Sequence, residues 1–355
     1  MRLLVTGACG FAGAALIESL LERISGLTVA GIDNLMRPGS ETNRVRLRRL
    51  GVEFFHGDVR SASDLDSLPK AEWVIDAAAN PSVLAGIGGH GSSRQLLEHN
   101  LFGVGNVLEY CRRHGSGLIL LSSSRVYSIP ELLRLPLRDT GERFELDASG
   151  SLPAGVSPCG IGPEFSTRPP VSLYGAGKLA AEVLALEYGE AFGFPVWIDR
   201  CGVLAGPGQF GASDQGIFSF WLNAHLRRRP LRYIGFDGSG KQTRDALHPR
   251  DLAALLSAQM SCGREGGRRI YTAGGGLGNS MSLRQLTAWC DARFGAFAPG
   301  ADLQPRRYDV PWLAMDNSPA RADFGWTPGI GLEELLGEIA AWALGHPDWL
   351  EISGL

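Results

Sequence analysis

The first 23 residues restrict the fold more than any other stretch of this sequence. An apolar run, Leu3 to Val5, is followed by glycines at positions 7, 10 and 13, and residues 14–23 are apolar at helical spacing. This order predicts a strand, a tight turn and a helix. Because glycine has no Cβ, such a turn brings its backbone close to a pyrophosphate, and the helix points its first N–H groups at that anion. The predicted dinucleotide-binding residues of this turn are Gly7, Cys9, Gly10, Phe11, Ala12 and Gly13.

A second predicted strand, residues 27–32, ends in an acid that completes this fingerprint. Asp33 stands twenty residues beyond Gly13. A carboxylate there accepts hydrogen bonds from the ribose hydroxyls of NAD and repels the 2′-phosphate of NADP. We therefore expect NAD as the cofactor, bound by Asp33 and Asn34. Arg37 nearby leaves NADP open as an alternative.

Strand and helix patterns alternate as far as residue 200. Further strands are predicted at 52–59, 73–79, 118–127 and 195–200, and the helices that accompany them at 43–50, 94–114 and 172–188. This alternation predicts an α/β fold with a Rossmann-type doubly wound parallel sheet and helices on both faces.

Beyond residue 200 the elements become short and mixed. We predict a helix at 217–228, a hairpin at 231–243 and helices at 249–260 and 332–344. The prediction is therefore an NAD-binding domain over 1–199 and a smaller mixed α/β, mainly substrate-binding domain over 200–355, with some segments returning to the Rossmann core. Residues 128–171, rich in Pro, Gly and Ser, are predicted to form an irregular insertion or lid on the substrate side.

Parallel sheets bind ligands at the carboxyl ends of their strands, and small or polar residues gather at those positions here. Asp58 and Val59 end the third strand beside the expected adenine, although Asp58 equally suits a strand-terminal turn. Asn100 interrupts the apolar face of a helix, either as a satisfied buried amide or as a support for a loop at the cofactor. The other predicted ligand positions are Ala77, Ala78, Ala79 and Asn80 after the fourth strand, and Ser122, Ser123 and Ser124 after the fifth.

Tyr174 and Lys178 are four residues apart, so they share one face of a helix. Hydride transfer from a secondary alcohol to NAD needs a base for the hydroxyl proton. Free tyrosine has a pKa of about 10, and a nearby ammonium favours its phenolate. A Tyr-x-x-x-Lys pattern alone also fits a helix-start aromatic and a solvated lysine. After a dinucleotide fingerprint and a serine-ended strand, we interpret a strand-end serine, Tyr174 and Lys178 as catalytic, with Lys178 also reaching the nicotinamide ribose.

Composition excludes several other functions. The net charge is −3 and no block is strongly basic or acidic, which argues against nucleic acid or an anionic membrane as the main partner. No apolar run is long enough to span a bilayer, and the chain opens directly on a strand, so we expect no secretory signal and a cytoplasmic location. The six cysteines are scattered without a Cys-x-x-Cys pair, and the seven histidines show no metal-ligand spacing, so no metal is expected.

Three segments together resemble the extended short-chain dehydrogenases/reductases, namely Thr6–Gly13, Ser122–Tyr127 and Tyr174–Lys178. The most similar branch is that of the NAD-dependent nucleotide-sugar epimerases and dehydratases, over essentially the whole chain. Arg244–Asp251 is similar to the Arg-Asp-x-x-His-x-x-Asp signature of that branch, whose arginine contacts the diphosphate of the substrate. A surface Arg–Asp pair is the alternative. The resemblance also implies a homodimer or homotetramer.

Finer features resemble the CDP-paratose 2-epimerase (CDP-tyvelose epimerase) group: Gly160–Phe165, Gln209–Gly216, Trp221 and Gly240–Asp245. This resemblance implies inversion at C2 of a CDP-sugar, in which hydride passes to tightly held NAD and returns to the other face of the ketone. Ser128 and Gly177 depart from the family pattern, and the segment 128–159 matches only loosely. The implied roles are Asn80, Ser124, Asp214, Gln215 and Arg244 toward the substrate, Val203 toward the cofactor, and Ser123 as the catalytic hydroxyl with Ser124 as its alternative.

Other reactions on this fold stay open. A 4-epimerase and a decarboxylase share the Ser/Tyr/Lys core. A dehydratase needs an acid/base pair, usually Asp-Glu, beside the strand-end hydroxyl, where this chain has Ser124 and Arg125, so elimination is disfavoured. A non-catalytic NAD sensor typically loses the Tyr or the Lys, and both are present here.

Overall fold

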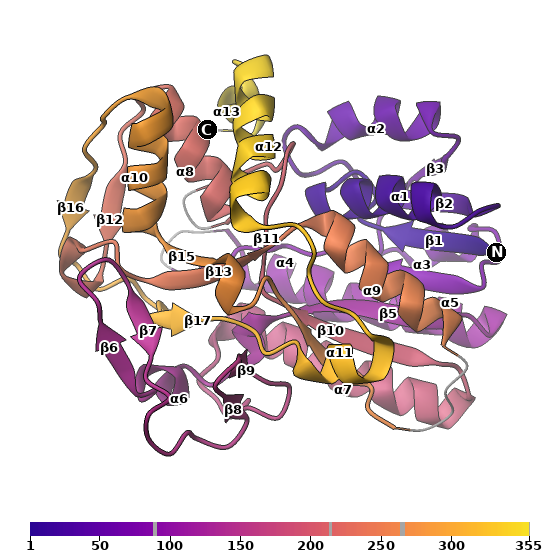
Figure 1. Cartoon of the computed structure of the whole chain (residues 1–355). Coiled ribbons are helices and arrows are strands. Elements are labelled where there is room, and N and C mark those ends of the chain that lie inside the picture. The colour runs from indigo at the N-terminus through magenta and orange to yellow at the C-terminus, as the bar shows by residue number, and fades with distance from the viewer. Residues whose placement is uncertain (88–90, 213–214, 263–266, 355) are drawn as a thin grey trace.

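A seven-stranded parallel sheet forms the centre of the molecule (Figure 1). The computed structural model describes residues 1–87, 91–212, 215–262 and 267–354. The strand order is β14-β10-β5-β4-β1-β2-β3. Because the order reverses between β1 and β4, a crevice opens at the carboxyl ends of these strands. The predicted Rossmann-type fold is confirmed. The strands are β1 (Arg2–Thr6), β2 (Thr28–Asp33), β3 (Glu53–His56), β4 (Trp73–Asp76), β5 (Gly117–Ser123), β10 (Val196–Cys201) and β14 (Ile270–Ala273).

Helices cover both faces of this sheet, so its central strands are apolar on both sides. Leu16, Ile17 and Leu20 of α1 are fully buried against one face, and α7 packs on the opposite face. The first face carries α1 (Phe11–Arg23), α2 (Ser40–Arg49), α9 (Pro249–Ser261) and α11 (Ser318–Phe324), and the other carries α3 (Ala62–Asp66), α5 (Gly103–His114) and α7 (Ser172–Phe192).

Three strands end earlier than the sequence predicts, because the chain turns at the crevice. β3 stops at His56, and Asp58 lies in the turn that follows. β4 ends at Asp76, and the alanines that follow leave the sheet and pack against the glycine turn. β5 stops at Ser123, and a 3₁₀ turn over Ser124–Val126 follows.

The predicted helix over 94–114 is interrupted. It consists of α4 (Ser93–Leu97), a short π-helix (Glu98–Phe102) and α5. The π-helix contains Asn100, whose side chain is fully buried. Such bulges re-aim single side chains and are frequent near functional sites.

The prediction that residues 128–171 are irregular is wrong for much of the segment. It forms α6 (Ile129–Leu133), a hairpin of β6 (Leu137–Asp139) and β7 (Phe144–Leu146), and a second pair, β8 (Val156–Ser157) and β9 (Gly160–Ile161). Ile161 and Phe165 are buried against residues 310–315. The segment therefore has its own apolar contacts with the C-terminal half, which its Pro, Gly and Ser content concealed.

A second, smaller sheet and several helices make up most of the C-terminal half, on the left of Figure 1. β13 pairs with β11, β15 and β17. These elements are β11 (Val203–Leu204), β13 (Thr243–Leu247), β15 (Ser280–Ser282), β17 (Trp312–Leu313), α8 (Ile217–Leu226), α10 (Leu283–Phe294), α12 (Leu332–Gly345) and α13 (Trp349–Ile352).

The predicted hairpin over 231–243 is wrong. β12 (Arg232–Ile234) pairs in parallel with β16 (Gly300–Asp302), whereas β13 pairs antiparallel with β15. Phe236 and Asp237 have positive φ and lie in a 3₁₀ turn, which directs the chain away from β12. The local pattern of two strands around a glycine turn did not reveal these distant partners.

The C-terminal half also returns to the first sheet. α9 packs along α1, and β14 forms the edge strand next to β10. No helix among the described residues is long and apolar enough to cross a membrane.

Asp199, in the middle of β10, is fully buried. Gln259 Nε2 donates to its Oδ1 at 2.8 Å, and its Oδ2 has no hydrogen-bond partner among the described residues. Burial raises the pKa of this carboxyl to about 7. The folded protein therefore holds a proton on Asp199 more tightly than the unfolded chain does, and that contribution to stability is lost as the pH rises from about 4 through 7.

We predict that Asp199→Asn removes this pH dependence. The unfolding free energy of the variant minus that of the wild type should increase by roughly 1–3 kcal/mol from pH 5 to pH 8, because the wild type must ionise a buried carboxyl over that range. Denaturant unfolding of both proteins at the two pH values measures the difference. An offset between the proteins that is the same at pH 5 and pH 8 would contradict the prediction.

Candidate active site

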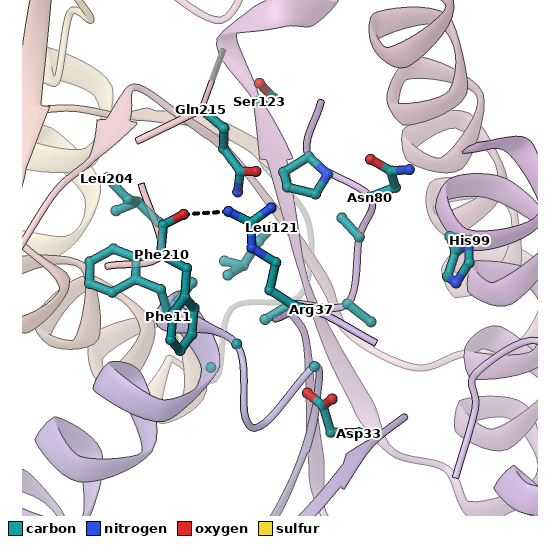
Figure 2. Close-up of a pocket in the computed structure, with 18 of the residues that line it drawn as sticks. Phe11, Asp33, Arg37, Asn80, His99, Leu121, Ser123, Leu204, Phe210 and Gln215 are labelled. Atoms are coloured by element: carbon teal, nitrogen blue, oxygen red, sulfur yellow. Dashed lines mark hydrogen bonds between the residues drawn. The ribbon is translucent and has the colours of Figure 1, made fainter. Parts of the chain in front are cut away.

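A cavity of about 500 Å³ lies in the crevice at the carboxyl ends of the sheet (Figure 2). We call it the glycine-turn cavity. Fifteen of the eighteen residues predicted to bind the cofactor line it: Gly7, Gly10, Phe11, Ala12, Gly13, Asp33, Asn34, Val59, Ala77, Ala78, Ala79, Ser122, Tyr174, Lys178 and Val203.

The glycines of the turn are required by close backbone packing. Gly7 has a φ of 62°, and a Cβ there would lie 2.8 Å from the Cα of Ala78. A Cβ on Gly13 would lie 2.2 Å from the carbonyl oxygen of Gly7. α1 starts at Phe11 with neither a side-chain cap nor an acidic residue in its first turn. The N–H groups and positive end of this helix are therefore left for an anion, as a dinucleotide pyrophosphate requires.

Two main-chain groups fix the carboxylate of Asp33 at the other end of this cavity. The N–H of Cys9 donates to Oδ2 at 2.9 Å, and the N–H of Leu35 donates to Oδ1 at 2.7 Å. Burial raises the pKa of Asp33. Cys9 does not line the cavity; burial raises the pKa of its thiol to about 12, so it stays protonated and acts through its backbone. This arrangement fits the ribose of a dinucleotide.

Asp58 and Asn100 lie behind the cavity wall. Asp58 accepts from Asn34 Nδ2 at 2.9 Å and pairs with Arg60, and these bonds, Arg60 first, hold the pKa of its carboxyl low. Asn100 accepts from the N–H of Asn80 at 2.8 Å and donates to the carbonyl of Asn80 at 2.9 Å. The two interpretations of Asn100 are compatible, because it is a satisfied buried amide and it also fixes the loop that contains Asn80. Asn80 itself lines the glycine-turn cavity.

Tyr174 and Lys178 project from the first turns of α7 toward the end of β5. Close packing brings the helix there, because a Cβ on Gly175 would lie 2.2 Å from the carbonyl oxygen of Arg125. Lys178 is buried, and its Nζ donates to the carbonyl of Leu121 at 2.9 Å. Buried Asp76 on β4 interacts electrostatically with this ammonium, although its burial still raises the pKa of its carboxyl. Nothing in the sequence singled out Asp76.

The three serines at the end of β5 have different surroundings. The hydroxyl of Ser122 donates to buried Glu182 on α7. The hydroxyl of Ser123 accepts from the N–H of Arg125 at 3.1 Å and keeps its own proton for donation. Ser124 lines a second cavity.

This second cavity, of about 390 Å³, adjoins the first, and we call it the Arg244 cavity. Ser124, Gln215 and Arg244, all predicted on the substrate side, line it, whereas Asn80 does not; Asp214 lies outside the described residues. Seven residues line both cavities: Pro81, Ser123, Tyr174, Gly202, Val203, Gln215 and Gly216. Ser123 and Tyr174, which both carry a hydroxyl group, therefore lie where the two cavities meet.

Arg244 on β13 is held in a fixed position. Its Nη2 donates to Asp309 Oδ1 at 3.0 Å and to the carbonyl of Val310 at 2.7 Å. The side chains of this pair are only 12% and 13% exposed. The alternative of a surface pair is therefore wrong. The neighbouring Asp245 is buried separately, accepting from the N–H groups of Gly276 and Met315, and burial raises its pKa to about 6.

A contact across the glycine-turn cavity was not expected. Arg37 extends over the cavity and donates to the carbonyl of Phe210, beside Gln215 (Figure 2). The ring of Phe210 stacks on Trp349 with centroids 5.2 Å apart, and Trp349 Nε1 donates to the carbonyl of Gln209 at 2.8 Å. These contacts hold the segment around Phe210, which belongs to the C-terminal half, over the glycine-turn cavity. Partners 173 residues apart leave no local sequence signal.

Other lining residues were also missed. Gln95 and His99 line the glycine-turn cavity, and Arg125, Arg232 and Arg306 line the Arg244 cavity. One sequence feature could have identified Arg125 as a site residue, because it directly follows the serines at the end of β5. Among the described residues, no cluster of His, Cys, Asp and Glu side chains is arranged to hold a metal ion.

Comparison with known proteins agrees with this architecture. Residues 3–274 match the NAD dependent epimerase/dehydratase family. Over 351 residues the chain is 26% identical to the CDP-paratose 2-epimerase of Salmonella typhi, covering 96% of this chain and 99% of that protein. Over 364 residues it is 28% identical to a dTDP-glucose 4,6-dehydratase of Streptomyces antibioticus, covering 99% and 95%. The structure of Thermus thermophilus UDP-glucose 4-epimerase with NAD aligns at a TM-score of 0.75 and 26% identity, over 97% of this chain and 99% of that chain.

These relatives are named for three different reactions at nearly equal identity, so identity does not select one of them. What they share with this chain is the family and its cofactor, and the glycine turn, the uncapped start of α1 and the Asp33 carboxylate all fit that cofactor. The chain therefore belongs to the NAD dependent epimerase/dehydratase family and is an NAD-dependent enzyme of the extended short-chain dehydrogenase/reductase type.

Proposed function

We propose that this enzyme is a nucleotide-sugar epimerase that inverts one ring carbon, specifically C2 of a CDP-sugar, through a transient ketone. The observation that supports it best is that Ser123 and Tyr174 line both cavities. A dinucleotide in the glycine-turn cavity and a sugar in the Arg244 cavity meet at these two residues. The paired arginine of the Arg244 cavity suits the diphosphate that joins sugar and nucleoside.

Three side chains of this site contribute to the proton transfer, each in a different way. NAD, when bound, would supply the hydride acceptor and donor for the sugar carbon. Tyr174 takes the proton of the sugar hydroxyl and later returns it, and the hydroxyl of Ser123 holds the same oxygen in position. The ammonium of Lys178, one turn further along α7, favours negative charge on the tyrosine oxygen during the transfer. Inversion follows when the ketone presents its other face before the hydride returns.

The charge of the Arg244 cavity favours epimerisation over dehydration. Elimination of water needs an acid and a base beside the reacting carbon, and Ser124 and Arg125 follow Ser123 here. Among the described lining residues, the one carboxylate is that of Asp309, which Arg244 and Gln242 already bind. The choice of C2 and of a CDP-sugar is supported by the finer features that resemble the CDP-paratose 2-epimerase group, namely Gly160–Phe165, Gln209–Gly216, Trp221 and Gly240–Asp245.

We predict that Tyr174→Phe lowers turnover of the accepted nucleotide-sugar by roughly 10²–10⁴-fold, because the general base is removed. NAD should remain bound, since the ring and the rest of the glycine-turn cavity are kept. Turnover is followed by NMR of CDP- and UDP-sugars, and bound NAD by chromatography of the denatured protein.

Tyr188→Phe is the matched control for this test. Tyr188 lies on the same helix, and its hydroxyl binds Glu109 at the surface. The control should turn over like the wild type. A Tyr174→Phe variant that also did so would remove Tyr174 from the catalytic role and with it the proposed chemistry.

We predict that Asp33→Ala weakens NAD binding by roughly 10–100-fold, the usual effect of losing charge-assisted hydrogen bonds. Titration of nucleotide-free protein with NAD and with NADP measures it, and the preference for NAD should shrink. The control is Asp66→Ala, an exposed carboxylate paired with Arg113. Thermal unfolding separates lost affinity from lost folding. NAD affinity equal to that of the control would refute a ribose-binding role for Asp33.

Arg37 gives a separate prediction about how firmly NAD is held. Arg37→Gln opens the contact with the Phe210 carbonyl, so NAD should dissociate about tenfold faster or more, as loss of one good contact usually does. Arg48→Ala, an exposed position on α2, is the control. Dilution of NAD-loaded protein into a trap enzyme for free NAD records the rate. Identical rates in the two variants would mean that the contact does not retain the cofactor.

A further inference from the structure

The Arg244 cavity carries much more positive than negative charge. Four arginines and one aspartate are its charged residues among those described: Arg125, Arg232, Arg244, Arg306 and Asp309. Asp309 accepts from Arg244 Nη2 at 3.0 Å and from Gln242 Nε2 at 3.1 Å, so its carboxylate is already engaged. The cavity as a whole therefore complements an anion.

Arg125 stands out among these arginines by its place. It lies in the 3₁₀ turn directly after β5, two residues beyond Ser123, and interacts electrostatically with Arg244, Asp309, Arg306 and Tyr174. Arg125 is thus the arginine of this cavity that lies next to the catalytic hydroxyls, while Arg244 is anchored on β13.

Arg125 also has little protein support for its charge. Among the described residues its guanidinium makes one hydrogen bond, from Nη1 to the carbonyl of Tyr308 at 3.2 Å. In the described part of the chain, no carboxylate lies within ion-pair distance of it. Burial, with the like charges of Arg244 and Arg306, lowers its pKa to about 10, and the carboxylate of Asp309 opposes that shift only in part. A guanidinium offers five N–H donors, so most of the donors of Arg125 have no acceptor among the described residues, and Arg125 lines the Arg244 cavity.

We propose that Arg125 is a substrate-binding residue that takes an oxyanion of the substrate close to the reacting carbon. The proposal rests on the proposed function, because it assigns a role within the same cavity. Two sources supply this chemistry: the phosphate group that carries the sugar, shared with Arg244, or a carboxylate on the sugar ring. The planar fork of arginine binds both in two-point geometry, which a lysine cannot match.

The test measures binding to the full-length protein loaded with NAD, by calorimetric titration with CDP, UDP, UDP-glucose and UDP-glucuronate. The variants are Arg125→Gln, Arg125→Lys and, as a control, Arg134→Gln directly after α6, where the arginine side chain is 72% exposed. If the phosphate is the anion, Arg125→Gln weakens all four ligands about tenfold or more. If a ring carboxylate is the anion, it weakens UDP-glucuronate alone. Arg125→Lys should recover part of either loss.

Other outcomes overturn the proposal in distinguishable ways. If Arg125→Gln binds all four ligands like the wild type, Arg125 does not bind substrate, while the epimerase assignment stands. If the only effect of Arg125→Gln is a changed pH profile of turnover, acting through Tyr174, Arg125 likewise does not bind substrate and the epimerase assignment stands. If the wild type binds none of the four nucleotides, the proposed function fails together with this inference. Thermal unfolding of each variant verifies folding, and the milder Arg125→Lys keeps the test decisive if Arg125→Gln is unstable.

Discussion

The contact between the glycine turn and the chain leaving β4 is the constraint on which the rest of the structure depends. Gly7 lies so close to Ala77 and Ala78 that a Cβ would overlap their backbone. This packing occurs where the strand order reverses, between β1 and β4, and it holds open the carboxyl edge of the sheet. The uncapped start of α1 and the Asp33 carboxylate then face one space, which a dinucleotide fits.

A second set of close approaches joins the two halves of the molecule around Ser123 and Tyr174. Gly175 lets α7 pack against the turn after β5, which brings Tyr174 beside Ser123 at the boundary of the two cavities. From the other half, β13 contributes Arg244, and the segment around Phe210 is fastened over the glycine-turn cavity by Arg37. The first half thus supplies the glycine-turn cavity and the Ser123 and Tyr174 hydroxyls, and the second supplies cover and positive charge.

Sequence reasoning succeeded where a function is encoded in a local pattern. The glycine turn, the acid twenty residues later and the Tyr–Lys spacing each follow from the geometry of one strand or helix, and the residues that they predicted at the cofactor, Cys9 apart, line the glycine-turn cavity. The alternation of strands and helices predicted the sheet. It failed where partners are distant in sequence. The hairpin at 231–243 was wrong because β12 pairs with β16, and Asp309 as the partner of Arg244 depends on packing that no local pattern records.

The most direct test of the central claim follows the sugar ring protons by NMR while the NAD-loaded enzyme acts on CDP-, UDP- and GDP-sugars in deuterated water. Direct hydride return predicts inversion at one ring carbon, with no deuterium incorporated and with NAD still bound to the protein afterwards. The position of the inverted carbon also distinguishes C2 from C4. Deuterium at a ring carbon would mean that a proton from solvent had replaced the original hydrogen. That result would contradict hydride return and favour enolisation or elimination.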